Sequence, residues 1–335
     1  MNVFLEAISG TETITLLQER GRASFRHQLV TKPEEADIIL MLGNPARQPG
    51  KLLDNHCYKN FPDRCAVYTE EDSYLPLIPG VYCSAQIGKS TSLGRVFSYS
   101  YVTRNGRHVN PFLPETILRH GGKLEEHPKK YLFSFQGGST SFVRKRLFAQ
   151  DFLQSDILIT NTAQFLNWDN SQHDRVERQQ QYARTILASH FVLCPRGAGS
   201  GSIRFFEVMA SGIAPVLIAD DYPLPIGVAW DSFLLRCPER EISRLPDLLV
   251  KHLPTAKRRG EIARSVFEEH FADHLEFDRI VELAMRSLGH EAPSEAWFRK
   301  RHLSMIRRFE LREKARSLVR AGVKNTLNAF GVRIV

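Results

Sequence analysis

The chain has 335 residues, of which 42% are hydrophobic and 24% charged, and its formal net charge is +8. This length favours two domains over a single core, and the composition argues against a disordered protein. No window is long and apolar enough for a membrane-spanning helix, and the N-terminus lacks the features of a signal peptide. Five scattered cysteines without a CxxC pair indicate reduced thiols in a cytosolic protein rather than disulfides or a zinc site.

The first 125 residues alternate short apolar runs with polar stretches, which favours an α/β layer arrangement. Helices are expected around 12–20 and 112–120, and strands at NVFLEA, ADIILML, RCAVYTEE, GVYCSAQI and RVFSYSYV. The polar segment 120–130 contains two glycines and a proline and predicts a linker. We therefore expect a first domain over residues 1–125.

Beyond the linker, predicted strands and helices alternate more clearly. Strands are expected at YLFSFQGG, DILIT, HFVLCP, APVLIAD and SFLLRC, and helices over 141–150, 174–188, 202–211 and in three stretches of about 240–288. Near-continuous apolar strands separated by helices indicate a parallel sheet covered on both faces, which binds ligands at the carboxyl ends of its strands. This pattern predicts a second domain over 126–290 and a helical tail over 291–335.

The stretch FVLCPRGAGSGSIRFFEVMASGIAPVLIADDYPLP (191–225) is the most informative. Its loop glycines let the backbone approach a ligand, and a helix starting near Ser202 offers free N–H groups and a positive dipole end. Arg196 and Arg204 flank this point and suit phosphate, while Glu207 can accept hydrogen bonds from two vicinal hydroxyls. These features together describe a nucleotide site. The alternative is a structural loop with an Arg204–Glu207 surface pair.

Several blocks in order resemble the signature of the exostosin family of glycosyltransferases. They are FVLCPRG, SIRFFEVMASGIAPVLIADDYPLP, the upstream YLFSFQGG with its basic helix, and VAWDSF at 228–233. The resemblance covers about 130–235. It implies an α/β GT-B architecture of two Rossmann-like domains, with the nucleotide sugar on the second domain and the acceptor between the two. It also implies inverting transfer, most often from a UDP-sugar, without an essential metal or other cofactor.

The resemblance also implies roles for single residues. Glu207 would bind the donor ribose, Arg196 and Arg204 the diphosphate, and Gly137–Gly138 would let the first loop approach the donor closely. The expected donor-binding residues are Gly137, Gly138, Arg144, Arg196, Gly197, Ser202, Arg204, Glu207, Asp220 and Asp221. A solvated basic helix face is the alternative for Arg144 and Lys145, and a turn cap is the alternative for the two aspartates.

One further residue bears on the stereochemistry of the sugar transfer. Gly199 stands where related retaining GT-B enzymes carry a second glutamate, which favours inversion. A retaining enzyme stays an alternative, as does a non-catalytic protein of the same fold that binds a nucleotide or carbohydrate.

Inverting transfer needs a base that takes the acceptor's proton. The candidates are Glu70, Glu71 and Asp72, which end an apolar run of the first domain. A charged turn or helix cap is the alternative for each acid. His27, His56 and His108 compete for the same role, and Trp168 could stack on a sugar or simply fill the core.

Residues 297–335 hold eleven Lys or Arg against Glu310 and Glu313, so this tail carries +9 and the rest of the chain −1. Apolar residues recur three or four apart, which predicts a basic amphipathic helix. We expect it to bind the anionic inner face of the cytoplasmic membrane. A helix packed across the domains is the alternative, and binding of nucleic acid is the least favoured role for this tail. The sequence thus predicts a cytoplasmic, bacterial glycosyltransferase that extends a surface glycan such as lipopolysaccharide.

Overall fold

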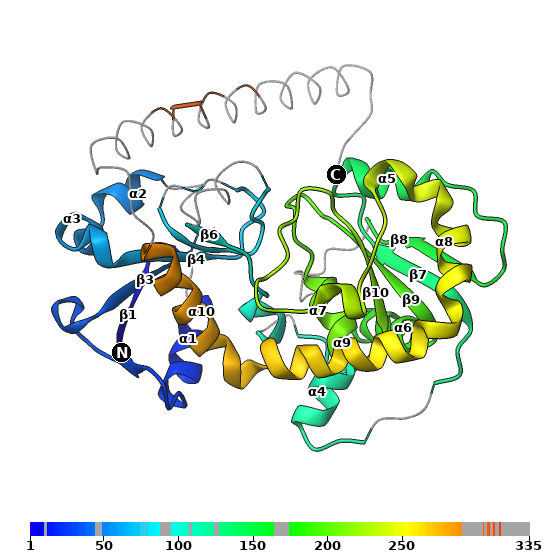
Figure 1. Cartoon of the computed structure of the whole chain (residues 1–335), viewed down its shortest axis with the longest axis horizontal. Coiled ribbons are helices and arrows are strands. Elements are labelled where there is room, and N and C mark those ends of the chain that lie inside the picture. Colours follow the sequence, from blue (N-terminus) through cyan, green and yellow to red (C-terminus); the bar gives the residue numbers. More distant parts are fainter. Residues whose placement is uncertain are drawn as a thin grey trace.

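The computed structural model describes residues 1–9, 12–43, 49–74, 76, 78–87, 95–106, 109–123, 127–163, 174–289 and five single residues between 304 and 315. These residues form two α/β domains, each built on its own parallel sheet (Figure 1). The predicted GT-B arrangement of two Rossmann-like domains is confirmed. His108, Trp168 and nearly all of the predicted amphipathic tail lie outside the described residues. None of the described helices combines the length and the apolar character needed to cross a membrane.

The first domain contains, in its described part, a six-stranded sheet in the order β2-β1-β3-β4-β5-β6. All neighbouring strands are parallel. The strands are β1 (Asn2–Ala7), β2 (Gln28–Leu29), β3 (Ile38–Leu42), β4 (Cys65–Thr69), β5 (Gly80–Tyr82) and β6 (Val96–Phe97). The helices are α1 (Glu12–Arg22), α2 (Pro49–Asp54) and α3 (His56–Asn60). Helix α4 (Pro114–Arg119) follows in the chain but lies against the second domain (Figure 1).

Alternate residues of these strands enter two different cores, because successive side chains of a strand point to opposite faces. Leu40 and Leu42 pack in one core with Leu17 of α1. Ile39 and Met41 pack in the other core, which also takes in residues of α2 and α3. Burial on both faces explains why β3 reads as a continuous apolar run in the sequence.

The second domain contains a five-stranded parallel sheet in the order β11-β10-β9-β7-β8. Its strands are β7 (Tyr131–Gly137), β8 (Ile157–Asn161), β9 (Ser189–Pro195), β10 (Ala214–Ile218) and β11 (Leu235–Arg236). Its helices are α5 (Phe142–Phe148), α6 (Arg175–Leu187), α7 (Ile203–Ala210), α8 (Leu245–His252) and α9 (Ala256–His270). The chain adds β8 on one side of β7 and β9 on the other. Ligands of open parallel sheets bind at such a switch point, outside the carboxyl ends of the strands.

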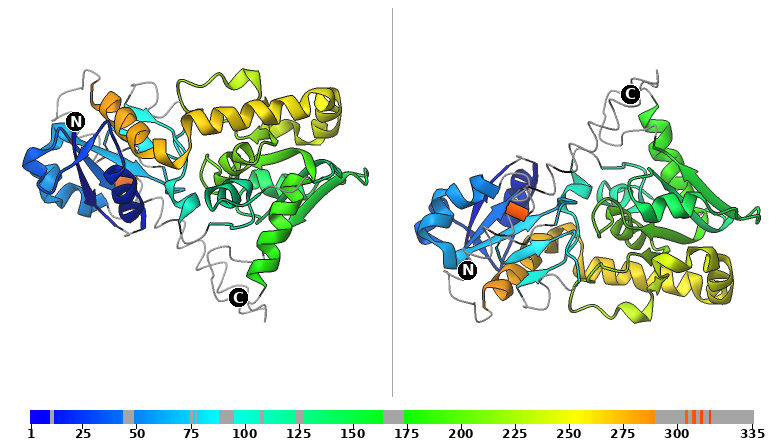
Figure 2. Two further views of the ribbon diagram at one scale, coloured as in Figure 1. Left: turned by 90° about the horizontal axis from the view of Figure 1, so that it is seen from below. Right: turned by 90° about the horizontal axis from the view of Figure 1, so that it is seen from above.

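Helix α10 (Asp273–Leu288) returns to the first domain, although it lies in the range expected for the second. Its buried residues Phe277, Ile280 and Val281 share a core with strands of the first sheet. Figures 1 and 2 show α9 running along the second domain and α10 continuing onto the first. The chain therefore crosses between the domains twice.

Candidate functional site

The two loops that the sequence singled out meet at the switch point between β7 and β9. Ser141 begins α5 by accepting the N–H of Arg144 on its Oγ at 3.2 Å. The same hydroxyl donates to the carbonyl of Arg196, directly after β9, at 3.0 Å. An ideal Cβ at Gly197 would lie 3.5 Å from Nη2 of Arg144. The sheet thus brings Arg144 to the loop after β9, as the rule for parallel sheets predicts.

Two arginines, the half-buried Arg144 and the buried Arg204, share one aromatic ring at this point. The Cζ atoms of Arg144 and Arg204 lie 5.5 Å and 4.6 Å from the ring centroid of Phe135 on β7. Arg144 donates to the carbonyls of Gly138 and Pro195 at 3.3 Å each, and Arg204 donates to the carbonyl of Gln136. The Nε atoms of both guanidinium groups are buried and have no hydrogen-bond partner in the described part of the chain.

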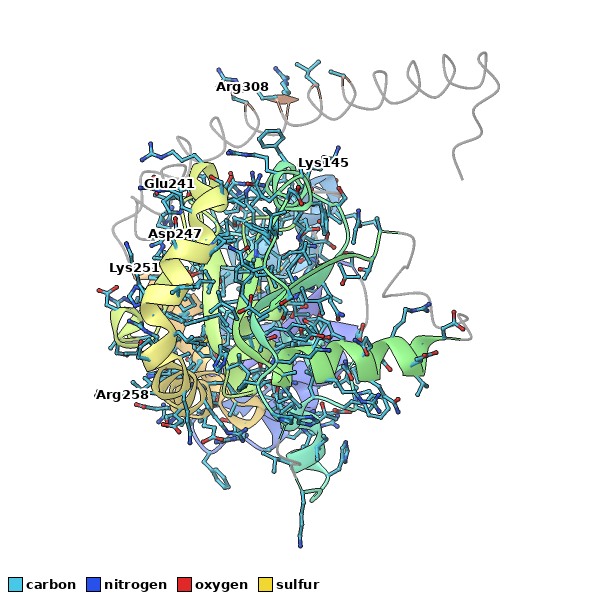
Figure 3. All side chains as sticks on the ribbon, turned by 90° about the vertical axis from the view of Figure 1, so that its right-hand side faces the viewer. Lys145, Glu241, Asp247, Lys251, Arg258 and Arg308 are labelled. Atoms are coloured by element: carbon cyan, nitrogen blue, oxygen red, sulfur yellow. The ribbon has the colours of Figure 1, made fainter. Side chains whose placement is uncertain are left out.

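The electrostatics of this pair favour an anion. Among the described residues, no carboxylate forms an ion pair with Arg144 or Arg204. Burial and then the nearby charge of Arg204 lower the pKa of Arg144 to about 10. The charges of Asp72 and Glu207 act on these arginines from a distance, and a bound anion would offset more of the repulsion between the two guanidinium groups. The neighbouring Lys145 is exposed and lies on the outer surface of α5 (Figure 3).

Glu207 lies on α7, one turn after Arg204, and is held by a residue that the sequence did not single out. The hydroxyl of Tyr182, on α6, donates to Oε2 of Glu207 at 2.6 Å. The Cζ atom of Arg204 lies 5.5 Å from the Tyr182 ring centroid. Burial raises the pKa of Glu207, while the Tyr182 hydrogen bond and the Arg204 charge oppose that rise. Arg204 is only 8% exposed, which contradicts the alternative of a surface pair.

Arg196 has a different environment from Arg144 and Arg204. It forms a two-pronged ion pair with Glu239, with Nε–Oε1 and Nη2–Oε2 distances of 2.7 Å and 3.4 Å. The N–H of Asp220 also donates to Glu239 Oε1 at 3.3 Å, and Asp220 Oδ1 accepts the N–H of Glu239 at 3.1 Å. Asp220 thus caps the turn that starts at Glu239. No sequence pattern pointed to Glu239, which lies 43 residues after Arg196.

The glycines of the loop after β9 serve the first domain more than a ligand. An ideal Cβ at Gly201 would overlap the carbonyl oxygen of Cys83 and the hydroxyl of Tyr101, and one at Gly199 would overlap Oγ of Ser84. The hydroxyl between them, on Ser200, donates to the carbonyl of Ala85 at 2.5 Å. Gly199 and Gly201 are therefore needed for close contact between the domains, whereas we expected these loop glycines to face a ligand.

The remaining expected residues also lie at this edge of the second sheet. An ideal Cβ at Gly138 would meet only ordinary contacts, the nearest at 3.7 Å, so that side of Gly138 is comparatively open. Ser202 precedes α7, is buried, and makes no side-chain capping hydrogen bond. Asp221 is exposed, and its carbonyl accepts the N–H of Ile87 from the first domain at 2.8 Å.

Of the three acids after β4, Glu70 is engaged inside the first domain. Its Oε1 accepts the Tyr68 hydroxyl at 2.7 Å and the Thr103 N–H at 3.1 Å. Its Oε2 accepts the Thr103 hydroxyl. Burial raises the pKa of Glu70, although these hydrogen bonds oppose the rise. Glu70 therefore anchors the 3-10 turn Val102–Asn105 to the sheet.

Asp72 has a different position from Glu70. It is exposed, and an ideal Cβ at Gly199 would lie 2.9 Å from its Oδ1. Of the three candidate histidines, the two that the structure describes lie away from this loop. His27 packs against Phe277 of α10 with ring centroids 6.4 Å apart, and His56 begins α3, which leads toward the amino end of β4. The structure thus brings Asp72 to the loop after β9.

Part of the chain is similar to known proteins. A family model described as the exostosin GT47 domain matches residues 95–252. An exostosin-1 homolog from Caenorhabditis elegans is 31% identical over 237 residues, which cover 65% of this chain and 59% of the relative. A probable glucuronoxylan glucuronosyltransferase from Arabidopsis thaliana is 32% identical over 130 residues, which cover 38% of this chain and 25% of the relative. The chain thus spans about three fifths of the nematode relative and a quarter of the plant one.

Among solved structures, a glycosyltransferase from Rickettsia africae is 10% identical, with a TM-score of 0.42, and the match covers 87% of this chain and 99% of that chain. The region that the family model matches contains α5 and α7, and hence Arg144, Arg204 and Glu207. The chain therefore contains a region similar to the exostosin GT47 domain, and this region holds both arginines and Glu207.

Proposed function

We propose that this protein is a glycosyltransferase that moves a sugar, with inversion, from a UDP-sugar to a glycan acceptor. The observation that carries the proposal is the pair Arg144 and Arg204 at the switch point of the second sheet, whose Nε atoms are buried and without a hydrogen-bond partner among the described residues. A diphosphate would supply the missing negative charge. The match of residues 95–252 to the exostosin GT47 domain supports the reaction class.

The geometry suggests how each part of the donor would bind. The two guanidinium groups and the amino end of α7 would hold the diphosphate, since both favour negative charge. Glu207, held in place by Tyr182, would accept hydrogen bonds from the ribose hydroxyls. When the sugar leaves, negative charge grows on the diphosphate, and preorganised arginines stabilise it there. We therefore propose that no metal ion is essential.

UDP binding tests this proposal. We expect calorimetry to detect UDP binding to the wild-type protein with the same Kd in EDTA as in a divalent ion. Replacing Glu207 by alanine should cost roughly 1.5–3 kcal/mol of binding free energy, the size of a lost hydrogen bond to a charged group. Replacing Arg204 by alanine should weaken binding at least as much. Glu177→Ala, an exposed site on α6, is the control and should leave the Kd unchanged.

Two results would contradict the proposal. A folded Glu207→Ala variant that binds UDP like the wild type would remove the ribose role. UDP binding or transfer that disappears in EDTA and returns only with a divalent ion would remove the metal-free mechanism. The donor sugar can then be screened, with UDP-glucuronic acid first because the plant relative is described as a glucuronosyltransferase. A product that keeps the donor's anomeric configuration would favour the retaining alternative.

We also propose that the acceptor is a lipid-linked glycan of a surface polysaccharide or lipopolysaccharide, reached at the cytoplasmic membrane. The support is the +9 charge of residues 297–335, which exceeds that of the whole chain. We expect the full chain, but not a chain ending at Pro293, to sediment with vesicles that contain anionic lipid, and salt should weaken this binding. Equal sedimentation of the two folded proteins would contradict the membrane role.

A further inference from the structure

Resting on the function proposed above, we propose that Asp72 is the general base that takes the proton from the acceptor hydroxyl. The strand β4 of the first domain ends at Thr69, and Asp72 follows at the carboxyl end of that strand. The loop after β9, in the second domain, meets it there. An acceptor bound between the domains would lie beside this carboxylate.

Contacts across the domain junction fix this placement. Oδ1 of Asp72 would lie 2.9 Å from an ideal Cβ on Gly199, so the carboxylate is next to the loop that leads into α7. Ser84 meets the same point of Gly199, where an ideal Cβ would overlap its Oγ. The charge of Asp72 also acts on Arg144, so the carboxylate lies on the side of the site that holds the arginines.

The neighbouring acid Glu70 is unsuited to the role. Both of its oxygens already accept hydrogen bonds from Tyr68 and Thr103, and they point into the first domain. A carboxylate with this many donors would have to break its hydrogen bonds before it could take a proton. Asp72 is exposed, and its carboxylate faces the second domain instead.

The step that follows is a direct displacement. The acceptor oxygen forms a bond to the anomeric carbon of the donor while its proton passes to a carboxylate oxygen of Asp72. The bond from that carbon to the diphosphate oxygen breaks, and the electron pair leaves with UDP, next to Arg144 and Arg204. The protonated Asp72 then loses its proton to water. Attack opposite to the leaving group inverts the anomeric configuration.

The experiment separates chemistry from donor binding in the full-length protein. UDP release is measured with water as acceptor, from UDP-glucuronic acid, UDP-glucose, UDP-galactose and UDP-N-acetylglucosamine. Loss of a general base typically costs about 100- to 10,000-fold in rate, so we expect Asp72→Asn to release UDP at least about 100-fold more slowly. The Kd for UDP and the melting temperature should stay at the wild-type values. Asp63→Asn, an exposed site at the amino end of β4, is the matched control and should behave like the wild type.

A second variant distinguishes a base from a merely structural contact. Azide needs no deprotonation, so it should restore UDP release to Asp72→Ala and give a glycosyl azide of inverted configuration. The proposal is overturned if Asp72→Asn keeps more than a tenth of the wild-type rate, or if azide restores nothing. A wild-type protein that binds no UDP would instead contradict the proposed function itself.

Discussion

Replacing Glu276 by alanine should lower the free energy of unfolding by about 3–5 kcal/mol, because it removes one partner from a buried ion network. Glu276 lies on α10 and is fully buried. Its two oxygens accept hydrogen bonds from Arg104 and Arg20. The Arg104 side chain is 1% exposed and also lies 2.9 Å from Glu115 and 3.1 Å from Asp273.

The position of this network explains the size of the effect. Arg20 belongs to α1 and Arg104 to the 3-10 turn Val102–Asn105, so Glu276 joins these two elements of the first domain to α10. Arg104 extends the network to Glu115 on α4. Arg104 also donates to the carbonyl of Phe271, between α9 and α10, at 3.0 Å. Without Glu276, two guanidinium groups would stay at the junction with less compensating charge, and burying them would cost more.

A matched substitution on the same helix provides the control. Glu282 pairs with Arg26 at 2.6 Å, but the two side chains are 35% and 63% exposed. Exposed pairs contribute roughly 0–1 kcal/mol, so Glu282→Ala should change stability little. Urea unfolding measures the free energy of unfolding of both variants, and an unchanged slope m checks that unfolding stays two-state. Equal midpoints for the two variants would show that the Glu276 network does not stabilise the fold.

The local parts of the fold were predictable from sequence. Expected strands such as ADIILML and APVLIAD contain β3 and β10, because strands buried on both faces leave an apolar run that needs no knowledge of partners. The amphipathic pattern of α10 shows that one face is buried, but it does not say against which sheet. Only tertiary packing places α10 on the first domain, and this is why the sequence assigned it to the second.

In the candidate site, too, local patterns were predictable and contacts between distant parts of the chain were not. Arg204 and Glu207 were found because one helix turn and one glycine-rich loop hold them within a few residues of each other. Tyr182 and Glu239 were missed because each contacts the site from a distant part of the chain, and neither residue type is unusual where it stands. Asp72 was one of three equivalent acids in the sequence, and only the contact with Gly199 distinguishes it.

Replacing Gly201 by alanine should separate the two domains where the loop after β9 meets the first sheet. The added Cβ would overlap the backbone oxygen of Cys83, which directly follows β5 and cannot move without moving that strand. Overpacking of this kind costs typically about 1–3 kcal/mol, and the protein can relieve it by shifting the loop away from the first domain. Asp72 would then lie farther from the proposed donor site on the second domain.

We therefore expect Gly201→Ala to release UDP from a UDP-sugar about 100-fold more slowly, the loss that a displacement of about 1 Å can cause in a positioned reaction. The Kd for UDP should change little, since Arg144, Arg204 and Glu207 all belong to the second domain. Gly50→Ala is the control, because an added Cβ there has no neighbour within 4 Å. Wild-type turnover in Gly201→Ala would show that the contact between the loop and Cys83 is dispensable. A large loss of UDP affinity would show that Gly201 serves the donor rather than the junction.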